Sequence, residues 1–282
     1  MTESQTPPMP GLPPAQAGKN RRGTSAVLRW AAAVAVFALT GTGTAYGISR
    51  ADRADLPGLA TRSDGRWEYP ALVRPPLPSG SPGPLAAANK SGTHYADLRA
   101  LRLPAPKNAT VDKTLSGTDG WLPVKDFLAQ YGGSERHQMG QELTDLGLRH
   151  VTSRGWTTPD GTRTRIDLLQ FATAEVAEES QGSFVSFAVP RHPLRGAPAF
   201  EPEGFPEAAR LDQVWLAAFA EAKPYGKEQM RVAYANAGDT VAMVTQSRPA
   251  GDTVAMVTQS RPGGAAAVPF WQTVTLQSEL LA

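Results

Sequence analysis

The stretch "QMRVAYANAGDTVAMVTQSRP", from Gln229 to Pro249, contains two short runs of valine, tyrosine, threonine and methionine. Such side chains fit the pleated, half-buried surface of a β-sheet, so each run predicts a strand. The intervening "NAGD", Asn236 to Asp239, supplies the small and polar residues of a tight connection. The stretch therefore predicts an antiparallel hairpin around which the rest of the domain must pack.

The second arm of this hairpin occurs twice. The thirteen residues "AGDTVAMVTQSRP" occupy positions 237–249 and, unchanged, positions 250–262. This pattern indicates a recent in-frame duplication, because repeat architectures need three or more units. Pairing with the second copy would enlarge the hairpin loop at a cost of only about 1 kcal/mol, so the first copy is preferred by a small margin. We expect the second copy to form an added edge strand or a surface loop. The sequence leaves open which copy was inserted.

A second hairpin is predicted upstream, in "LRHVTSRGWTTPDGTRTRIDLLQF" at residues 148–171. Its two strand-like runs flank a turn at Pro159, Asp160 and Gly161. In the second arm threonines and an isoleucine alternate with charged residues, which predicts one face toward the core and one toward water. The residues of the charged face are Arg163, Arg165 and Asp167.

Three helices are indicated by apolar periodicity and by capping residues. The first begins at Pro123, the second is capped by Ser134 and ends at Gly147, and a short third is capped by Thr173. The apolar spacing of "VPFWQTVTLQSELLA", residues 268–282, predicts a terminal helix.

The order of hairpin and helix occurs twice, around residues 148–181 and 229–281. We therefore predict that residues 119–282 form an α+β domain, a mainly antiparallel sheet with its helices on one face. Between residues 207 and 222 the pattern fits a helix and a strand equally, and the choice stays open.

The N-terminal third of the sequence predicts a membrane segment. Residues 30–48, "WAAAVAVFALTGTGTAYGI", carry no charge and would span roughly 28 Å as a helix. Residues 1–29 are rich in proline and have a net charge of +3, so this leader should be disordered and cytoplasmic. Residues 49–118 predict a disordered spacer rich in proline, glycine and alanine. A cleaved signal peptide is the alternative and would make the protein secreted rather than membrane-anchored.

Composition excludes several classes of function. The net charge is +2, with no strongly basic surface, which argues against nucleic-acid binding. The absence of cysteine excludes disulfides, cysteine nucleophiles and cysteine metal ligands. The oligomeric state is left open.

Motifs for catalysis, cofactor binding or metal binding are missing from the sequence. It has no GxSxG motif, Walker loop or dinucleotide fingerprint. The four histidines show none of the usual ligand spacings; they are His94, His137, His150 and His192. We therefore assign no catalytic, cofactor-binding or metal-binding residues.

One possible ligand face was found on the second hairpin. Arg163, Arg165 and, across the turn, Arg154 predict a basic stripe on its outer face, with Trp156 placed to stack beside it. Such a stripe suits an anionic polymer of the cell envelope. The simpler interpretation is that the arginines solubilise an exposed face.

The chain resembles the exported or membrane-anchored proteins of unknown function that are common in high-GC actinobacteria. The stretches "DGTRTRIDLLQFATAEVAEE", "VAYANAGDTVAMVTQSR" and "PFWQTVTLQSELL" are similar in rhythm to the extracytoplasmic sensor-type domains of that group. This resemblance implies an extracytoplasmic α+β domain and supplies no catalytic residues.

These observations predict a single-pass membrane protein that displays a non-enzymatic binding or sensing domain outside the cell. Its partners would be the membrane, through one helix, and an envelope protein or anionic polymer. The alternative is an extracytoplasmic hydrolase with an unrecognised site, which would need a pocket that gathers His150, a carboxylate and a serine or threonine.

Overall fold

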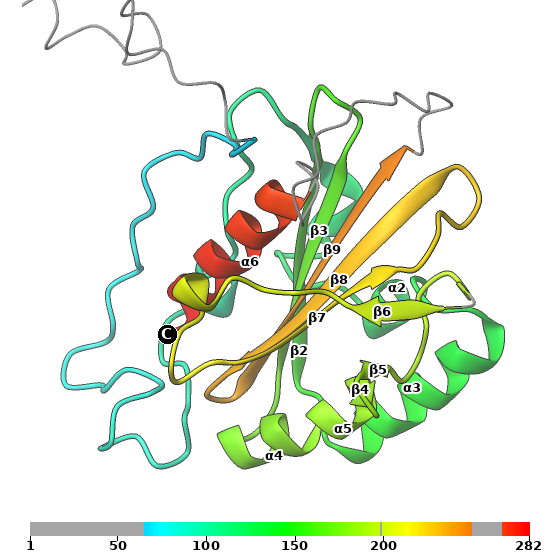
Figure 1. Cartoon of the computed structure of the whole chain (residues 1–282). Coiled ribbons are helices and arrows are strands. Elements are labelled where there is room, and N and C mark those ends of the chain that lie inside the picture. The colour runs from blue at the N-terminus through cyan, green and yellow to red at the C-terminus, as the bar shows by residue number, and fades with distance from the viewer. Residues whose placement is uncertain (1–64, 198, 250–266) are drawn as a thin grey trace, which may run out of the picture. The chain divides into compact units, whose positions relative to one another are not determined.

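The computed structural model describes residues 65–197, 199–249 and 267–282. Within these ranges the main feature is a seven-stranded sheet in the order β1-β2-β3-β9-β8-β7-β6, in which every neighbouring pair is antiparallel (Figure 1). The strands are β1 Thr110–Asp112, β2 His150–Thr157, β3 Arg163–Gln170, β6 Phe200–Pro202, β7 Trp215–Glu221, β8 Glu228–Ala237 and β9 Thr240–Pro249. A separate two-stranded ribbon pairs β4, Val185–Ser186, with β5, Val189–Pro190.

Both predicted hairpins are confirmed. β8 and β9 pair from Glu228 opposite Pro249 to Ala237 opposite Thr240, so two residues form the connection. The first copy of the duplicated phrase therefore forms β9, which pairs with β8 on one edge and β3 on the other. The second copy lies outside the described residues. β2 and β3 form the other hairpin. The undecided segment 207–222 contains a 3₁₀ helix, η4 Glu207–Ala209, followed by β7.

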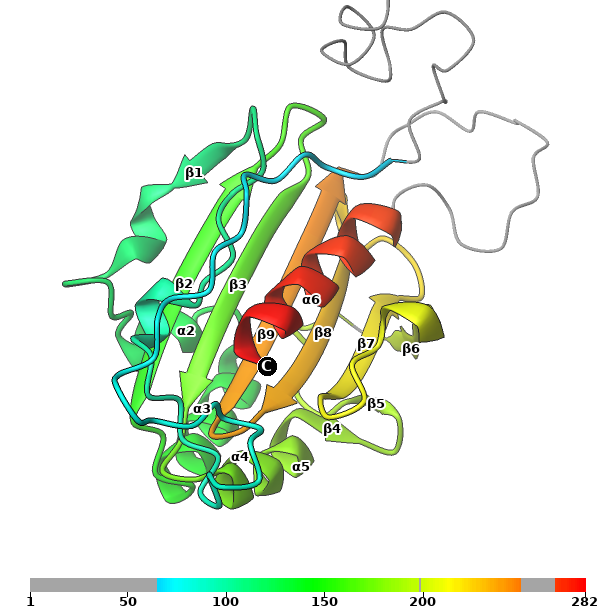
Figure 2. The same ribbon diagram turned by 90° about the vertical axis from the view of Figure 1, so that its left-hand side faces the viewer.

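The helices lie on both faces of the sheet, so the prediction of helices on one face was wrong. Figure 2 shows α6, Ala267–Leu281, across β9 and β8 on the near side, with the other helices behind. Those helices are α2 Val124–Leu128, α3 Gly133–Asp145, α4 Ala174–Glu179 and α5 Gln181–Phe184. Side chains alternate across a strand, and β8 and β9 are apolar on both sides. Ala233 and Val244 pack toward α6, whereas Tyr234 and Met243 pack toward α2–α5.

The helix ends follow the predicted capping chemistry with two exceptions. One is Pro123, which occupies the N-cap position of α2 rather than its first helical position. The Thr173 side chain accepts a hydrogen bond from the Val176 amide at the start of α4, as expected. Gly147 has a φ of +67° just beyond α3. Ser134 is not the cap of α3, because the helix begins at Gly133 and Gly132 occupies the cap position. The C-terminal helix is confirmed as α6.

The described part of the expected spacer, residues 65–118, packs on the sheet. Leu98, in the 3₁₀ helix η2 (Leu98–Ala100), and the nearby Leu101 and Leu103 are at most 4% exposed and belong to the core beneath α6. The Leu103 amide donates a hydrogen bond to the Gln277 side chain of α6. A second short helix, η3 Lys113–Ser116, follows β1. The folded unit therefore extends further toward the N-terminus than predicted, because scattered apolar residues among the prolines cover the α6 side.

A buried histidine joins this segment to the hairpin and to the C-terminus. The ring nitrogens of His94 lie 2.6 Å from an Asp239 carboxylate oxygen and 2.9 Å from the Leu281 carbonyl oxygen. Gln170 and Thr240 also donate hydrogen bonds to Asp239, at 3.1 and 2.9 Å. Three distant segments are thereby fixed together.

The predicted membrane segment at residues 30–48 lies outside the described residues, as do the leader and the first part of the spacer. Among the described residues no helix has the length and apolar character needed to cross a bilayer.

The glycine in the β8–β9 connection gives a test of this packing. Gly238 has a φ of +53°, and a Cβ there would collide with the carbonyl oxygen of Gly92. We expect Gly238→Ala to lower the free energy of unfolding by about 3 kcal/mol, through backbone strain and overpacking together. Gly226, at φ +73°, has open space around its Cβ position, so Gly226→Ala should lose only about 1 kcal/mol. Chemical unfolding of the two full-length variants measures the difference, and equal losses would show that the contact with Gly92 is unimportant.

Candidate functional site

An open cleft of about 300 Å³ lies on the α2–α5 side of the sheet, where β2 and β9 end and β3 and β8 begin. Its floor carries the side chains of Arg163, Arg165, Thr245 and Ser247. The strand register explains this grouping, because Arg163 lies opposite Ser247 and Arg165 opposite Thr245. Its walls include Asp112 and Leu115 on one side and Leu194, Arg195 and Glu228 on the other. The volume is at the lower end of the range of ligand pockets.

Arg165 is held rigidly by a buried carboxylate. Its Nε lies 3.0 and 2.9 Å from the two oxygens of Asp167, whose side chain is completely buried. Asp167 also accepts hydrogen bonds from Gln130 Nε2, at 3.0 Å, and from the Ser153 hydroxyl. Among the described residues the Arg165 Nη1 group has no partner. The guanidinium is thus fixed in place with donors left over.

Arg195 is held in a similar way on the opposite wall. Its backbone has a φ of +58°, and its amide donates to the Gln130 carbonyl at 3.0 Å. Its Nη2 donates to Glu221, whose side chain is completely buried and also accepts from the Met230 amide at 2.9 Å. Arg195 Nε is buried without a hydrogen-bond partner among the described residues.

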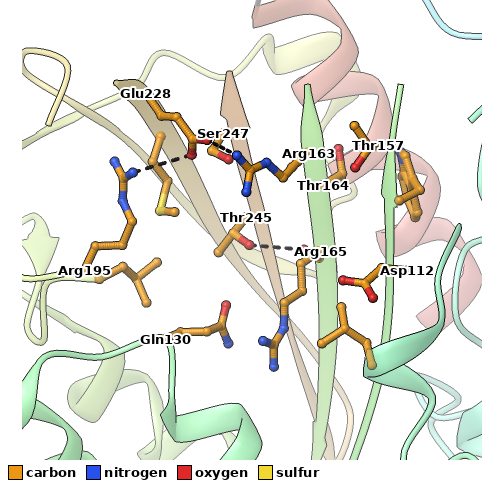
Figure 3. A pocket seen from close by; sticks show the side chains of 14 residues that line it. Asp112, Gln130, Thr157, Arg163, Thr164, Arg165, Arg195, Glu228, Thr245 and Ser247 are labelled. Carbon is orange, nitrogen blue, oxygen red and sulfur yellow. Dashed lines mark hydrogen bonds and ion pairs between the residues drawn. The ribbon is translucent and has the colours of Figure 1, made fainter. Parts of the chain in front are cut away.

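Glu228 lies between two of the arginines. One of its carboxylate oxygens accepts a hydrogen bond from Arg163, and the other lies 3.7 Å from Arg195 Nη1. Figure 3 shows Glu228 between these two guanidinium groups, whereas Arg165 points away from them, toward the level of Gln130. A chain of alternating charges therefore runs from Arg163 through Glu228 and Arg195 to the buried Glu221.

The four residues of the predicted ligand face are divided between the two faces of the sheet. Arg163 and Arg165 lie in the cleft. Arg154 lies on the α6 side and donates to the carbonyl oxygens of Arg102 and Leu103 at 3.0 and 3.2 Å, and burial lowers the pKa of its guanidinium. Trp156 borders the cleft, but its ring is 1% exposed and packs edge-on against Tyr69 in the α6-side core. The predicted stripe is therefore not continuous.

The sequence did not reveal the partners that complete the site. Arg195 comes from the proline-rich excursion at residues 190–206, and Glu228 is 65 residues from Arg163 along the chain. The strand order β3-β9-β8 brings Glu228 to Arg163, and the hydrogen bond from the Arg195 amide to the Gln130 carbonyl holds Arg195 beside them. The alternation of Arg163 and Arg165 was the one usable local signal.

The histidines lie away from the cleft. His150 is exposed at the start of β2 and stacks on Trp121 with a centroid distance of 4.7 Å. His192 lies 2.6 Å from Glu135 of α3. Among the described residues no carboxylate or hydroxyl group forms a hydrogen bond with the His150 ring, as the hydrolase alternative would require. Within the same ranges no group of three or more histidine and carboxylate side chains is arranged to hold a metal ion.

No protein-family model and no curated protein matches the sequence. Among solved structures, the chain is similar to the extracellular domain of PknH from Mycobacterium tuberculosis, with 10% sequence identity and a TM-score of 0.30. The match covers 61% of this chain and 77% of that one. A superposition at this level assigns neither ligand nor activity to the cleft.

The buried carboxylate beneath Arg165 supplies a test of how the site is built. Asp167→Asn removes the charge that pairs with Arg165, and we expect a loss of about 2 to 4 kcal/mol in the free energy of unfolding. The control is Glu68→Gln, in an ion pair with Lys107 whose side chains are 70% and 57% exposed. That variant should lose less than about 0.5 kcal/mol. If urea unfolding shows equal effects, Asp167 does not anchor the cleft.

Proposed function

We propose that the domain is a non-enzymatic binding or sensing module that holds an anionic ligand of the cell envelope in this cleft. The observation that carries the proposal is the fixed Arg165 guanidinium, whose Nη1 group has no partner among the described residues, in a cleft that Arg163 and Arg195 also line. Guanidinium groups recognise carboxylates and phosphates through paired hydrogen bonds. Because Arg165 is held from beneath by Asp167, little conformational entropy is lost when a ligand binds to it.

The surrounding floor suits a polar ligand. Thr157, Thr245 and Ser247 border the same cleft with their hydroxyl groups; that of Thr245 donates to the Arg165 carbonyl at 3.5 Å, and its oxygen can still accept. Met230 and Leu194 supply apolar contacts at its edge. Five of the fourteen lining residues are charged, and with the hydroxyl groups they make the cleft suited to a charged or polar ligand.

The cellular setting of the proposal rests on the sequence. The uncharged segment at residues 30–48, with basic residues before it, supports a single membrane helix with the N-terminus in the cytoplasm. The cleft would then face the outside of the cell, where envelope polymers carry many acidic groups.

Ligand binding is tested with an arginine that is not part of the core. The Arg163 side chain is 65% exposed, so Arg163→Gln should fold normally. We expect the full-length chain to bind oligogalacturonate or poly(glycerol phosphate) at low ionic strength, and Arg163→Gln to weaken that binding about tenfold. Titration calorimetry measures both affinities.

The matched control is Arg191→Gln, which removes another surface arginine paired with a glutamate, in this case Glu142. Arg191 lies outside the cleft, and its variant should bind like the parent protein. Equal weakening by both variants, or no binding of either polymer to the parent protein, would refute the proposal.

Topology is tested separately with a fusion. A reporter enzyme that is active only outside the cytoplasm, fused after Ala282, should be active, and deletion of residues 30–48 should abolish its activity. An expressed but inactive full-length fusion would contradict the export of the domain.

A further inference from the structure

The three arginines of the cleft are each paired with a carboxylate, so an incoming anion does not meet free positive charge. Arg165 pairs with Asp167, Arg195 with Glu221, and Arg163 with Glu228. The Arg165 Nη1 group can bind a ligand without displacing Asp167, but an anionic ligand that takes over the paired contacts of Arg163 or Arg195 has to compete with their carboxylates. They differ in how easily they can leave.

Two of the three carboxylates are fixed. The Asp167 and Glu221 side chains are completely buried, and each accepts hydrogen bonds from groups besides its arginine. Gln130 and Ser153 donate to Asp167, and the Met230 amide donates to Glu221. Exchanging either of them would leave several buried donors unsatisfied, which is costly.

Glu228 is not fixed in this way. Its side chain is 19% exposed, and among the described residues it has no side-chain partner other than Arg163 and Arg195. Its main chain is held independently, by pairing with β9 and by a hydrogen bond from the Tyr225 amide to its carbonyl oxygen at 3.0 Å. The carboxylate can therefore swing out of the cleft by side-chain rotation alone, without disturbing the sheet.

We propose that Glu228 is an internal substitute for a ligand carboxylate, and that binding exchanges the Glu228 carboxylate for that of the ligand between Arg163 and Arg195. This inference rests on the proposed function. The two oxygens of Glu228 face one arginine each, which is the arrangement that a ligand carboxylate would take over. The positive charges of Arg163 and Arg195 are balanced by Glu221 and Glu228, so exchange preserves neutrality, whereas addition of an anion beside Glu228 would not.

The exchange also gives the cleft its selectivity. A neutral ligand that displaces Glu228 leaves Arg163 without its carboxylate and the cleft with one unbalanced positive charge, so it is rejected. A ligand with a carboxylate replaces the lost contacts with equivalent ones. Displacement of Glu228 therefore lowers the affinity of every ligand, and only an acidic ligand recovers this loss through its own contacts with the arginines.

The experiment compares three probes on the full-length chain. They are N-acetyl-trialanine with a free C-terminal carboxylate, the same peptide as its C-terminal amide, and trigalacturonate. The first and third distinguish a peptide carboxylate from a sugar carboxylate as the source of the acid. Glu228→Gln removes the internal competitor, and we expect it to raise the affinity for at least one acidic probe about tenfold while the amide stays unbound.

The matched control is Asp112→Asn. Asp112 borders the same cleft, but its carboxylate accepts from the amide and hydroxyl of Thr114, at 2.9 and 2.6 Å, rather than pairing with a cleft arginine. This variant removes the same charge without removing the competitor, so the affinity should change by less than about twofold. An equal gain in both variants would reduce the effect to general electrostatics and overturn the proposal.

A second substitution guards against misfolding. Glu228→Asp keeps the charge but is one methylene shorter, so it spans the two arginines less well and should give an affinity between those of the parent protein and Glu228→Gln. If acidic probes bind the parent protein and Arg163→Gln weakens them, but neither Glu228 variant strengthens them, the exchange is refuted while the proposed function stands. If no acidic probe or polymer binds any variant, the proposed function fails and this inference falls with it.

Discussion

Both faces of β8 and β9 have to be kept from water, and the rest of the domain is arranged around that constraint. Val232, Tyr234 and Met243 face one side, and Ala233 and Val244 the other, and all five are at most 1% exposed. Burial of a large apolar side chain contributes about 1.5 to 3 kcal/mol, so leaving either face open would remove a large part of the stability of a typical domain. One helix with the N-terminal segment covers one face, and four shorter helices cover the other.

The cleft lies where the apolar surface beneath α2–α5 ends. Toward the end of β9 the floor changes from Val241 and Met243 to Thr245 and Ser247, and β3 changes in the same way from Leu169 to arginine. Charged groups this close to a core need partners, because a buried unpaired carboxylate is strongly destabilising. The pairing that satisfies Asp167 and Glu221 also fixes the positions of Arg165 and Arg195. The contacts that stabilise the buried carboxylates are therefore the same contacts that hold the arginines in position for a ligand.

The parts of the fold that depend on local pattern could be predicted from the sequence. The two hairpins and α6 follow from turn residues and apolar spacing within short windows. The packing of residues 65–118 could not, because Leu98, Leu101 and Leu103 have no helical or strand period and the prolines around them resemble a linker. The presence of helices on both faces was not predicted, because β8 and β9 were interpreted as strands with only one face covered, whereas both of their faces are buried.

For the candidate site, too, the sequence predicted only what depends on local pattern. Arg163 and Arg165 were recognised because they alternate along one strand. Their assignment to one stripe with Arg154 and Trp156 failed, because the register of β2 against β3 places those two residues on the opposite face. Glu228 joins the site through strand order and Arg195 through a loop contact with Gln130, and no short window of sequence contains either relation.

The position of β9 inside the sheet has a consequence for the duplicated phrase. β9 is paired along both edges, so the sheet has one place for this sequence, and the chain carries two identical segments with which to fill it. If the second segment formed this strand instead, the same residue types would pair with β3 and β8. That change would transfer thirteen residues from the connection before α6 into the loop after β8. The choice between the two copies is thus a competition between two loop lengths, decided by chain entropy rather than by side chains.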